Sequence, residues 1–131
     1  MTKRVLIVDD EPRVIEVLRE FFARFQHGHA YEITSAESVA EAVDILRREL
    51  FDLILLDMIM PRVGGLDLLK RIRTLGVKAP VLVMSGGWDI QKQGEALLAG
   101  AVGYLHKPFD MRELDHSVVL ALGSGPRATG G

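Results

Sequence analysis

Short apolar runs recur along this 131-residue chain, and polar residues follow each run directly. The runs at residues 5–8, 53–56, 81–84 and 102–105 have the length of strands. The run at 53–56 is apolar at every position, as is typical of a parallel strand covered on both faces. The stretches between the runs repeat apolar residues at helical spacing. Strands alternating with helices are the sequence signature of an α/β protein with a parallel sheet.

A further strand and five helices complete the predicted pattern. Residues 31–34 alternate in polarity and predict a strand at the edge of the sheet. The first helix is expected to begin at Pro12, because proline is favoured at the first helical position, and Gly76 is expected to end the third helix. The segment 89–99 is the weakest helix, since Gly94 and two glutamines dilute its apolar residues. The predicted apolar faces of the other four helices are Val14, Val17, Leu18, Phe21, Phe22 and Phe25; Val39, Ala42, Val43 and Leu46; Leu66, Leu69, Ile72 and Leu75; and Met111, Leu114, Val118, Ala121 and Leu122.

Length and composition set limits on the fold and on the partners. A chain of this length fits one domain, and five β–α pairs imply a doubly wound parallel sheet with helices on both faces. The Gly-, Ser- and Pro-rich residues 123–131 are expected to form a flexible tail or the stub of a linker, which leaves 1–122 as the domain. The net charge of −2 gives no support for binding nucleic acid or an anionic membrane. The chain has no cysteine, no apolar stretch near the length of a membrane span and no pattern of a signal peptide, so we expect a cytoplasmic protein.

The polar residues that follow the runs are the candidate functional residues. They are the pair Asp9-Asp10, then Asp57, Ser85 and Lys107. Because the strands are predicted to be parallel, these side chains should emerge at one carboxyl edge of the sheet, where ligands bind in open α/β proteins. Three carboxylates held together repel one another unless a cation intervenes, and Mg²⁺ prefers oxygen ligands. An aspartate there can attack phosphorus while a lysine and a hydroxyl bind the phosphoryl oxygens.

Each of these residues also has an ordinary structural explanation. An acidic pair before a helix commonly caps it, a strand-end aspartate is commonly a turn residue, and a lysine before proline is commonly a solvated surface residue. Those explanations are individually favoured. Together they require coincidences at four different strand ends, and we therefore favour a functional site.

The motifs around these residues resemble the receiver domain of two-component response regulators. The matching segments are Val-Leu-Ile-Val-Asp-Asp-Glu-Pro at 5–12, Leu-Ile-Leu-Leu-Asp-Met-Ile-Met-Pro at 53–61, Val-Leu-Val-Met-Ser-Gly at 81–86, and Gly-Ala-Val-Gly-Tyr-Leu-His-Lys-Pro-Phe at 100–109. The resemblance covers residues 3–122. It implies a (βα)5, flavodoxin-like, three-layer fold with strand order 2-1-3-4-5.

The resemblance also implies a role for each site residue. Asp57 would be the phosphoacceptor. Mg²⁺, with Mn²⁺ as a further candidate, would be held by Asp9, Asp10, Asp57 and the backbone carbonyl of Ile59, with Asp9 acting through water. Ser85, Gly86 and Lys107 would contact the phosphoryl group, and Ser85 and Tyr104 would form the switch. The bond before Pro108 would be cis.

The implied function is that of a switch in a phosphorelay rather than of an enzyme. The phosphoryl donor would be a histidine kinase or a histidine phosphotransfer protein. An output domain or protein partner would read the face formed by the fourth helix, fifth strand and fifth helix, and a phosphorylation-dependent homodimer is compatible with that face. Direct contact with nucleic acid is disfavoured, because the last helix carries no basic stripe. The sequence leaves open whether the receiver stands alone or belongs to a longer regulator.

Other functions fit the sequence less well. The alternative we retain is an Mg²⁺-dependent aspartyl-phosphate phosphohydrolase, but the haloacid-dehalogenase type of phosphatase needs a second aspartate two residues after the nucleophile, where this chain has Ile59. A dinucleotide-binding protein would carry glycines after the first strand, where this chain has acidic residues. A metal pair at His27 and His29 is also conceivable, but we expect a solvated loop there.

Overall fold

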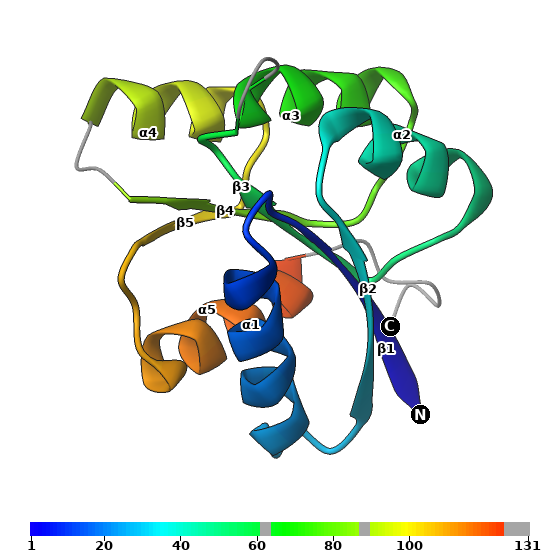
Figure 1. Cartoon of the computed structure of the whole chain (residues 1–131), viewed down its shortest axis with the longest axis vertical. Helices are drawn as coiled ribbons and strands as arrows, with labels where there is room; N and C mark the ends of the chain where they lie inside the picture. The colour runs from blue at the N-terminus through cyan, green and yellow to red at the C-terminus, as the bar shows by residue number, and fades with distance from the viewer. Residues whose placement is uncertain (61–63, 87–89, 125–131) are drawn as a thin grey trace.

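The computed structural model of the chain describes residues 1–60, 64–86 and 90–124. Its strands are β1 Thr2–Val8, β2 Ala30–Ala36, β3 Leu53–Asp57, β4 Val81–Ser85 and β5 Gly103–His106. Its helices are α1 Pro12–Arg24, α2 Val39–Arg48, α3 Gly65–Thr74, α4 Ile90–Leu98 and α5 Met111–Ser124. The strands form one parallel sheet in the order β2-β1-β3-β4-β5. The helices α1 and α5 lie on one face and α2, α3 and α4 on the other (Figure 1), so the expected doubly wound, flavodoxin-like fold is confirmed.

The sheet separates two apolar cores, and side-chain alternation along the central strands supplies both of them. In β1, Leu6 and Val8 pack towards α2 and α3, whereas Val5 and Ile7 pack towards α1 and α5. All four side chains are fully buried. Burying one such side chain stabilises the fold by roughly 1.5–3 kcal/mol. Strands that are apolar at every position are therefore required at the centre of this sheet, because both of their faces are covered.

Local signals in the sequence account for the ends of two helices. The Ser38 side chain accepts a hydrogen bond from the backbone N–H of Glu41 at 3.1 Å and caps the start of α2. At the end of α3, Gly76 has a φ of 77°, and the N–H of Val77 donates to the carbonyl of Ile72 at 3.2 Å. This pattern is the Schellman motif, which needs a residue tolerant of positive φ. Gly76 thus ends the helix as expected.

Two expectations about helices were wrong in detail. Val17 was placed on the apolar face of α1, but its side chain is 46% exposed, and Ile15, which we omitted, is buried instead. The buried arc of α1 is centred on Ile15, Leu18 and Phe22, so Val17 lies beyond its edge. The tail was expected to begin at residue 123, but α5 continues through Ser124. The rest of that expected tail, residues 125–131, lies outside the described residues.

The expectation of a solvated loop at His27 was also wrong. The Nδ1 atom of His27 lies 2.5 Å from the Tyr31 hydroxyl, and its Nε2 lies 2.9 Å from Oδ1 of Asp115. The ring also stacks on Phe25 with centroids 4.8 Å apart. Burial, with a smaller contribution from the Asp115 charge, raises the pKa of Tyr31 to about 12. His27 therefore ties the α1–β2 loop to β2 and α5, and it does so through an aspartate that is 88 residues away in the chain.

Candidate functional site

The three aspartates predicted to share a site do come together at the carboxyl edge of the sheet. Asp9 and Asp10 follow β1, and Asp57 is the last residue of β3, which pairs directly with β1. Carboxylate oxygens of the three residues lie within 4.8 Å of one another. Asp9 and Asp57 are buried, and Asp10 is partly exposed. Among the described residues this is the one group of three or more carboxylates or imidazoles close enough to hold a metal ion, so His27 and His29 are not part of such a group.

Lys107 brings a positive charge into the same cluster. It follows β5, and its backbone N–H donates to the Ser85 carbonyl at 2.7 Å. Its Nζ donates to Oδ2 of Asp9 at 3.0 Å and lies 3.5 Å from Oδ2 of Asp57. The Lys107–Pro108 peptide bond is cis, as the resemblance implies. The lysine thus contacts carboxylates that come from two neighbouring strands.

Burial and the neighbouring charges together shift the pKa values of Asp57 and Lys107. Burial raises the pKa of Asp57, although a hydrogen bond from the backbone of Ile59 and the charge of Lys107 act in the opposite direction. Burial of the Lys107 ammonium lowers its pKa, but the hydrogen bond to Asp9 and the charge of Asp57 outweigh burial, so the pKa is raised overall. One ammonium faces three carboxylates, which leaves two negative charges uncompensated when all are ionised. The donor set therefore fits a hard divalent cation.

The backbone around Asp57 is held in place by hydrogen bonds and by one close approach. Its Oδ1 accepts from the N–H of Ile59 at 3.1 Å. The carbonyl of Met58 accepts from the N–H of Gly65 at 3.1 Å. A Cβ atom on Gly65 would lie 2.4 Å from the Asp57 carbonyl oxygen and 2.7 Å from the Met58 Cα atom. Glycine is required at position 65 because α3 begins against the backbone of β3. The sequence patterns did not reveal this role.

Ser85 and Gly86 lie at the carboxyl end of β4. Ser85 is buried, and its register places it beside His106 of β5. Gly86 is exposed, and no atom lies within 4 Å of the position that its Cβ would occupy. The space beside the Gly86 backbone is therefore open at this end of β4.

Tyr104 lies on β5, on the side of the sheet that α3 and α4 cover. Its ring is partly buried and its centroid is 4.9 Å from that of His106. The Tyr104 hydroxyl is buried and has no hydrogen-bond partner among the described residues. A buried hydroxyl without a partner costs roughly 1–3 kcal/mol. Hydrogen bonding therefore does not stabilise the Tyr104 ring in this position. Trp88, near Ser85 in sequence, lies outside the described residues.

An apolar groove of about 520 Å³ adjoins the cluster. It runs between α1 and the segment after β5, and its lining includes Val14, Val17, Phe21, Pro108 and Phe109. Gly86 and Lys107 also line the groove, and the Lys107 ammonium contacts Asp9 and Asp57. The unexpected exposure of Val17 is accounted for by its place in this groove.

These features agree with what comparison with known proteins shows. Residues 5–119 match the family model described as the response regulator receiver domain, and the chain belongs to that family. It is the receiver domain of a two-component response regulator.

Particular relatives place the chain within that family. It is 35% identical over 114 residues to the response regulator MprA of Mycobacterium tuberculosis, an alignment that covers 87% of this chain and 48% of the relative. The chain thus spans about half the length of the curated relatives it matches. The receiver domain of the Francisella response regulator 1452 is 28% identical, with a TM-score of 0.81 over 92% of this chain and 97% of that one. A CheY-like receiver domain protein from Methanospirillum hungatei is 26% identical, with a TM-score of 0.81 over 94% of this chain and 95% of that one.

Proposed function

We propose that Asp57 accepts a phosphoryl group from a phosphohistidine on a histidine kinase or a histidine phosphotransfer protein. The observation that carries the proposal is the position of Asp57, which is buried at the carboxyl edge between a lysine and two further carboxylates. Oδ1 of Asp57 accepts the hydrogen bond from Ile59, whereas Oδ2 faces the Lys107 ammonium at 3.5 Å. We assign Oδ2 as the nucleophile.

The transfer exchanges one bond to phosphorus for another. A new bond forms between phosphorus and Oδ2 of Asp57 while the bond from phosphorus to the donor imidazole nitrogen breaks. The imidazole departs with the electron pair of the broken bond and takes up a proton. Lys107 lies on the side of the attacking oxygen, where it stabilises the charge carried by the phosphoryl oxygens.

The same carboxylates are the proposed metal ligands. Asp10 and Asp57 would bind the ion directly, Asp9 would act through water, and the backbone carbonyl of Ile59 would complete the protein ligands. Receiver domains generally use Mg²⁺, and the surplus negative charge of this cluster suits Mg²⁺ or Mn²⁺. When bound, the ion would neutralise carboxylate and phosphoryl charge. Lys107 alone cannot balance this cluster, so we propose that transfer depends on a divalent cation.

Phosphorylation would then change the set of charges that Ser85 and Lys107 face. The phosphoryl group adds about −1.5 to −2 charges and strong acceptor oxygens. We propose that the hydroxyl of Ser85, the backbone of Gly86 and the ammonium of Lys107 contact those oxygens. Movement of Ser85 would free space for the Tyr104 ring. The Tyr104 hydroxyl has no hydrogen-bond partner among the described residues, so no hydrogen bond holds the ring where it now lies. The switch is therefore the pair formed by Ser85 and Tyr104.

Two surfaces would contact partners in this scheme. We propose that the groove beside Lys107 receives the phosphodonor, because Lys107 both lines the groove and faces Asp57, and because much of the rest of the lining is apolar. On the other side, α4 exposes Ile90, Leu97 and Leu98, and only Ala96 of that helix is buried. We propose that an output domain or partner protein binds the face of α4, β5 and α5, which could also mediate a phosphorylation-dependent homodimer.

No helix in the described part of the chain is long and apolar enough to cross a membrane. We propose a cytoplasmic location.

Slow loss of the phosphoryl group, rather than catalytic turnover, is expected of this site. A phosphohydrolase would need a general acid next to the nucleophile, and the exposed side chain nearest in sequence is the apolar Ile59. The proposal is tested by incubating the protein with acetyl phosphate and Mg²⁺ and measuring its mass. Wild type should gain one phosphoryl group, and Asp57→Asn should gain none. Labelling of both proteins or of neither would overturn the assignment.

A further inference from the structure

A second groove lies at the opposite edge of the sheet from Asp57. Its volume is about 600 Å³. It is enclosed by the ends of α2, α3 and α5 and by the segments that lead into β3 and β4. The apolar part of its lining includes Leu46, Phe51, Leu75, Val77 and Leu122. The volume lies within the roughly 300–1,000 Å³ typical of binding sites, and no residue of the phosphoryl site lines it.

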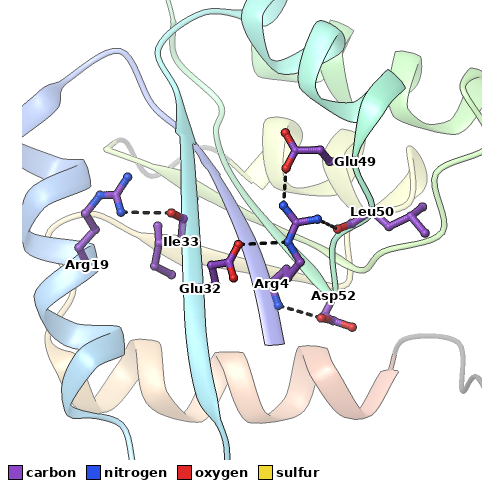
Figure 2. A network of polar contacts seen from close by, with 7 residues as sticks. All are labelled: Arg4, Arg19, Glu32, Ile33, Glu49, Leu50 and Asp52. Atoms are coloured by element: carbon purple, nitrogen blue, oxygen red, sulfur yellow. Dashed lines mark hydrogen bonds and ion pairs between the residues drawn. The ribbon is translucent and has the colours of Figure 1, made fainter. Parts of the chain in front are cut away.

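One wall of this groove is held by Arg4 (Figure 2). The Arg4 guanidinium pairs with Glu49, donates from Nη1 to the carbonyl of Leu50 at 2.9 Å and lies over the Phe51 ring at 4.9 Å. The backbone N–H of Arg4 donates to Oδ2 of Asp52 at 2.8 Å. The loop between α2 and β3 is therefore fixed at several points. Of the two carboxylates in the groove lining, Glu49 is paired with the guanidinium, and Asp52 accepts a hydrogen bond from the backbone N–H of Arg4.

The two lysines in the lining have no such partner. Within the described residues, neither Lys3 nor Lys78 forms an ion pair or a side-chain hydrogen bond. The basic residues of the last turns of α2 and α3 are explained by the partial negative charge at helix C-termini. That explanation does not apply to Lys3, which is in β1, or to Lys78, which lies between α3 and β4. Within the described part of the chain, these two ammonium groups in the lining therefore have no carboxylate partner.

An apolar side chain stands beside the groove on the fixed loop. Leu50 is 87% exposed, although its carbonyl is held by Arg4, and its side chain extends away from the polar network in Figure 2. A single exposed leucine is ordinary on a protein surface. Here it is held on a fixed loop next to a concave apolar lining and two unpaired lysines, and the three features together have the form of a docking site.

We propose that this groove docks an acidic polypeptide segment of a partner protein, in which apolar side chains contact Leu50 and the groove floor while flanking carboxylates pair with Lys3 and Lys78. A second copy of this chain fits less well, because its own carboxylates here are already held by Arg4 and its lysines would meet lysines. Because the groove and Asp57 are at opposite edges of the sheet, a docked segment would not cover the phosphoryl site.

The test uses the full chain, labelled with ¹⁵N, and a probe peptide of about ten residues, which spans ~15 Å as a helix. The peptide carries two leucines flanked by glutamates, and a second peptide has lysine at each glutamate position. The acidic peptide should shift the amide resonances of the residues that line the groove, and the basic peptide should not. Added salt should weaken binding, because exposed ion pairs are screened.

Charge-reversal variants distinguish binding in the groove from non-specific electrostatic attraction to the protein surface. The double variant Lys3→Glu and Lys78→Glu should weaken binding by about tenfold or more, since each reversal replaces an attraction with a repulsion. The control Lys70→Glu changes an exposed lysine of α3 that does not line the groove and should bind as wild type does. Acetyl phosphate labelling should be unchanged in both variants. Equal binding of both peptides, an equal loss in the control, or no shift in the groove would each overturn the proposal.

Discussion

Replacing Gly65 by alanine should disturb the end of β3, which carries Asp57, more than the small size of the added methyl group suggests. The new methyl group would lie 2.4 Å from the Asp57 carbonyl oxygen and 2.7 Å from the Met58 Cα atom. Both are backbone atoms, so no flexible side chain can move out of the way. To reach an ordinary contact of 3.4 Å, the start of α3 and the end of β3 must separate by about 1 Å.

That displacement sets the expected energy. Overpacking by one methyl group against rigid surroundings costs about 1–3 kcal/mol. The hydrogen bond from the Gly65 N–H to the Met58 carbonyl, now 3.1 Å, should lengthen as well. We therefore expect Gly65→Ala to lower the free energy of unfolding by about 1–3 kcal/mol and to slow labelling by acetyl phosphate, because Asp57 moves relative to Lys107.

Urea unfolding of Gly65→Ala beside Gly64→Ala measures this effect with a matched control. A Cβ atom on Gly64 would meet only the Met58 carbonyl oxygen, at an ordinary 3.9 Å. The control should cost about 0.5–1 kcal/mol, less than Gly65→Ala, because Gly64 is the N-cap of α3 and alanine caps a helix less well than glycine does. If the two variants unfold at the same urea concentration and accept phosphate at the same rate, the steric argument is wrong.

Other predictions follow from single side chains. Because the raised pKa of Asp57 makes the folded protein bind a proton there more tightly than the unfolded chain does, the free energy of unfolding should fall as the pH rises through that pKa. In urea without divalent cations, Asp57→Asn should therefore be more stable than wild type at neutral pH, with a difference that shrinks in acid; a constant difference would contradict this. Ile59→Asn should shorten the phosphoryl lifetime, because the exposed isoleucine hinders the attacking water, and equal dephosphorylation rates would refute that role. Tyr104→Phe should leave the free energy of unfolding unchanged or raise it, since the hydroxyl that it removes is buried and unpartnered. A double-mutant cycle of His27→Ala with Asp115→Ala should show a coupling of about 0.5–3 kcal/mol in unfolding, and additive effects would show that the pair contributes nothing.

The sequence predicted the fold and the acidic cluster well because both depend on local patterns. The run at 53–56 is typical of a strand covered on both faces, and a parallel sheet then brings Asp9, Asp57 and Lys107 to one edge. The boundary of α3 followed from Gly76, whose positive φ is a local requirement. These features need no knowledge of distant contacts.

The features that were missed depend on contacts between distant segments. His27 looked like part of a solvated loop because its partner Asp115 lies on α5, far along the chain. Val17 belongs to an apolar pattern by its spacing, but the position of α1 on the sheet turns it towards a groove. The need for glycine at position 65 arises from how closely α3 approaches β3, which no local pattern encodes.

The central claim is that Asp57, and no other carboxylate of the cluster, carries the phosphoryl group. The most direct measurement is to label wild type with acetyl phosphate and Mg²⁺ and to find the modified residue by fragmentation mass spectrometry. The label should be on Asp57, it should require the divalent cation, and Asp57→Asn should abolish it without unfolding the protein. A label on Asp9 or Asp10 in the wild type, or the same labelling with the cation removed, would contradict the account.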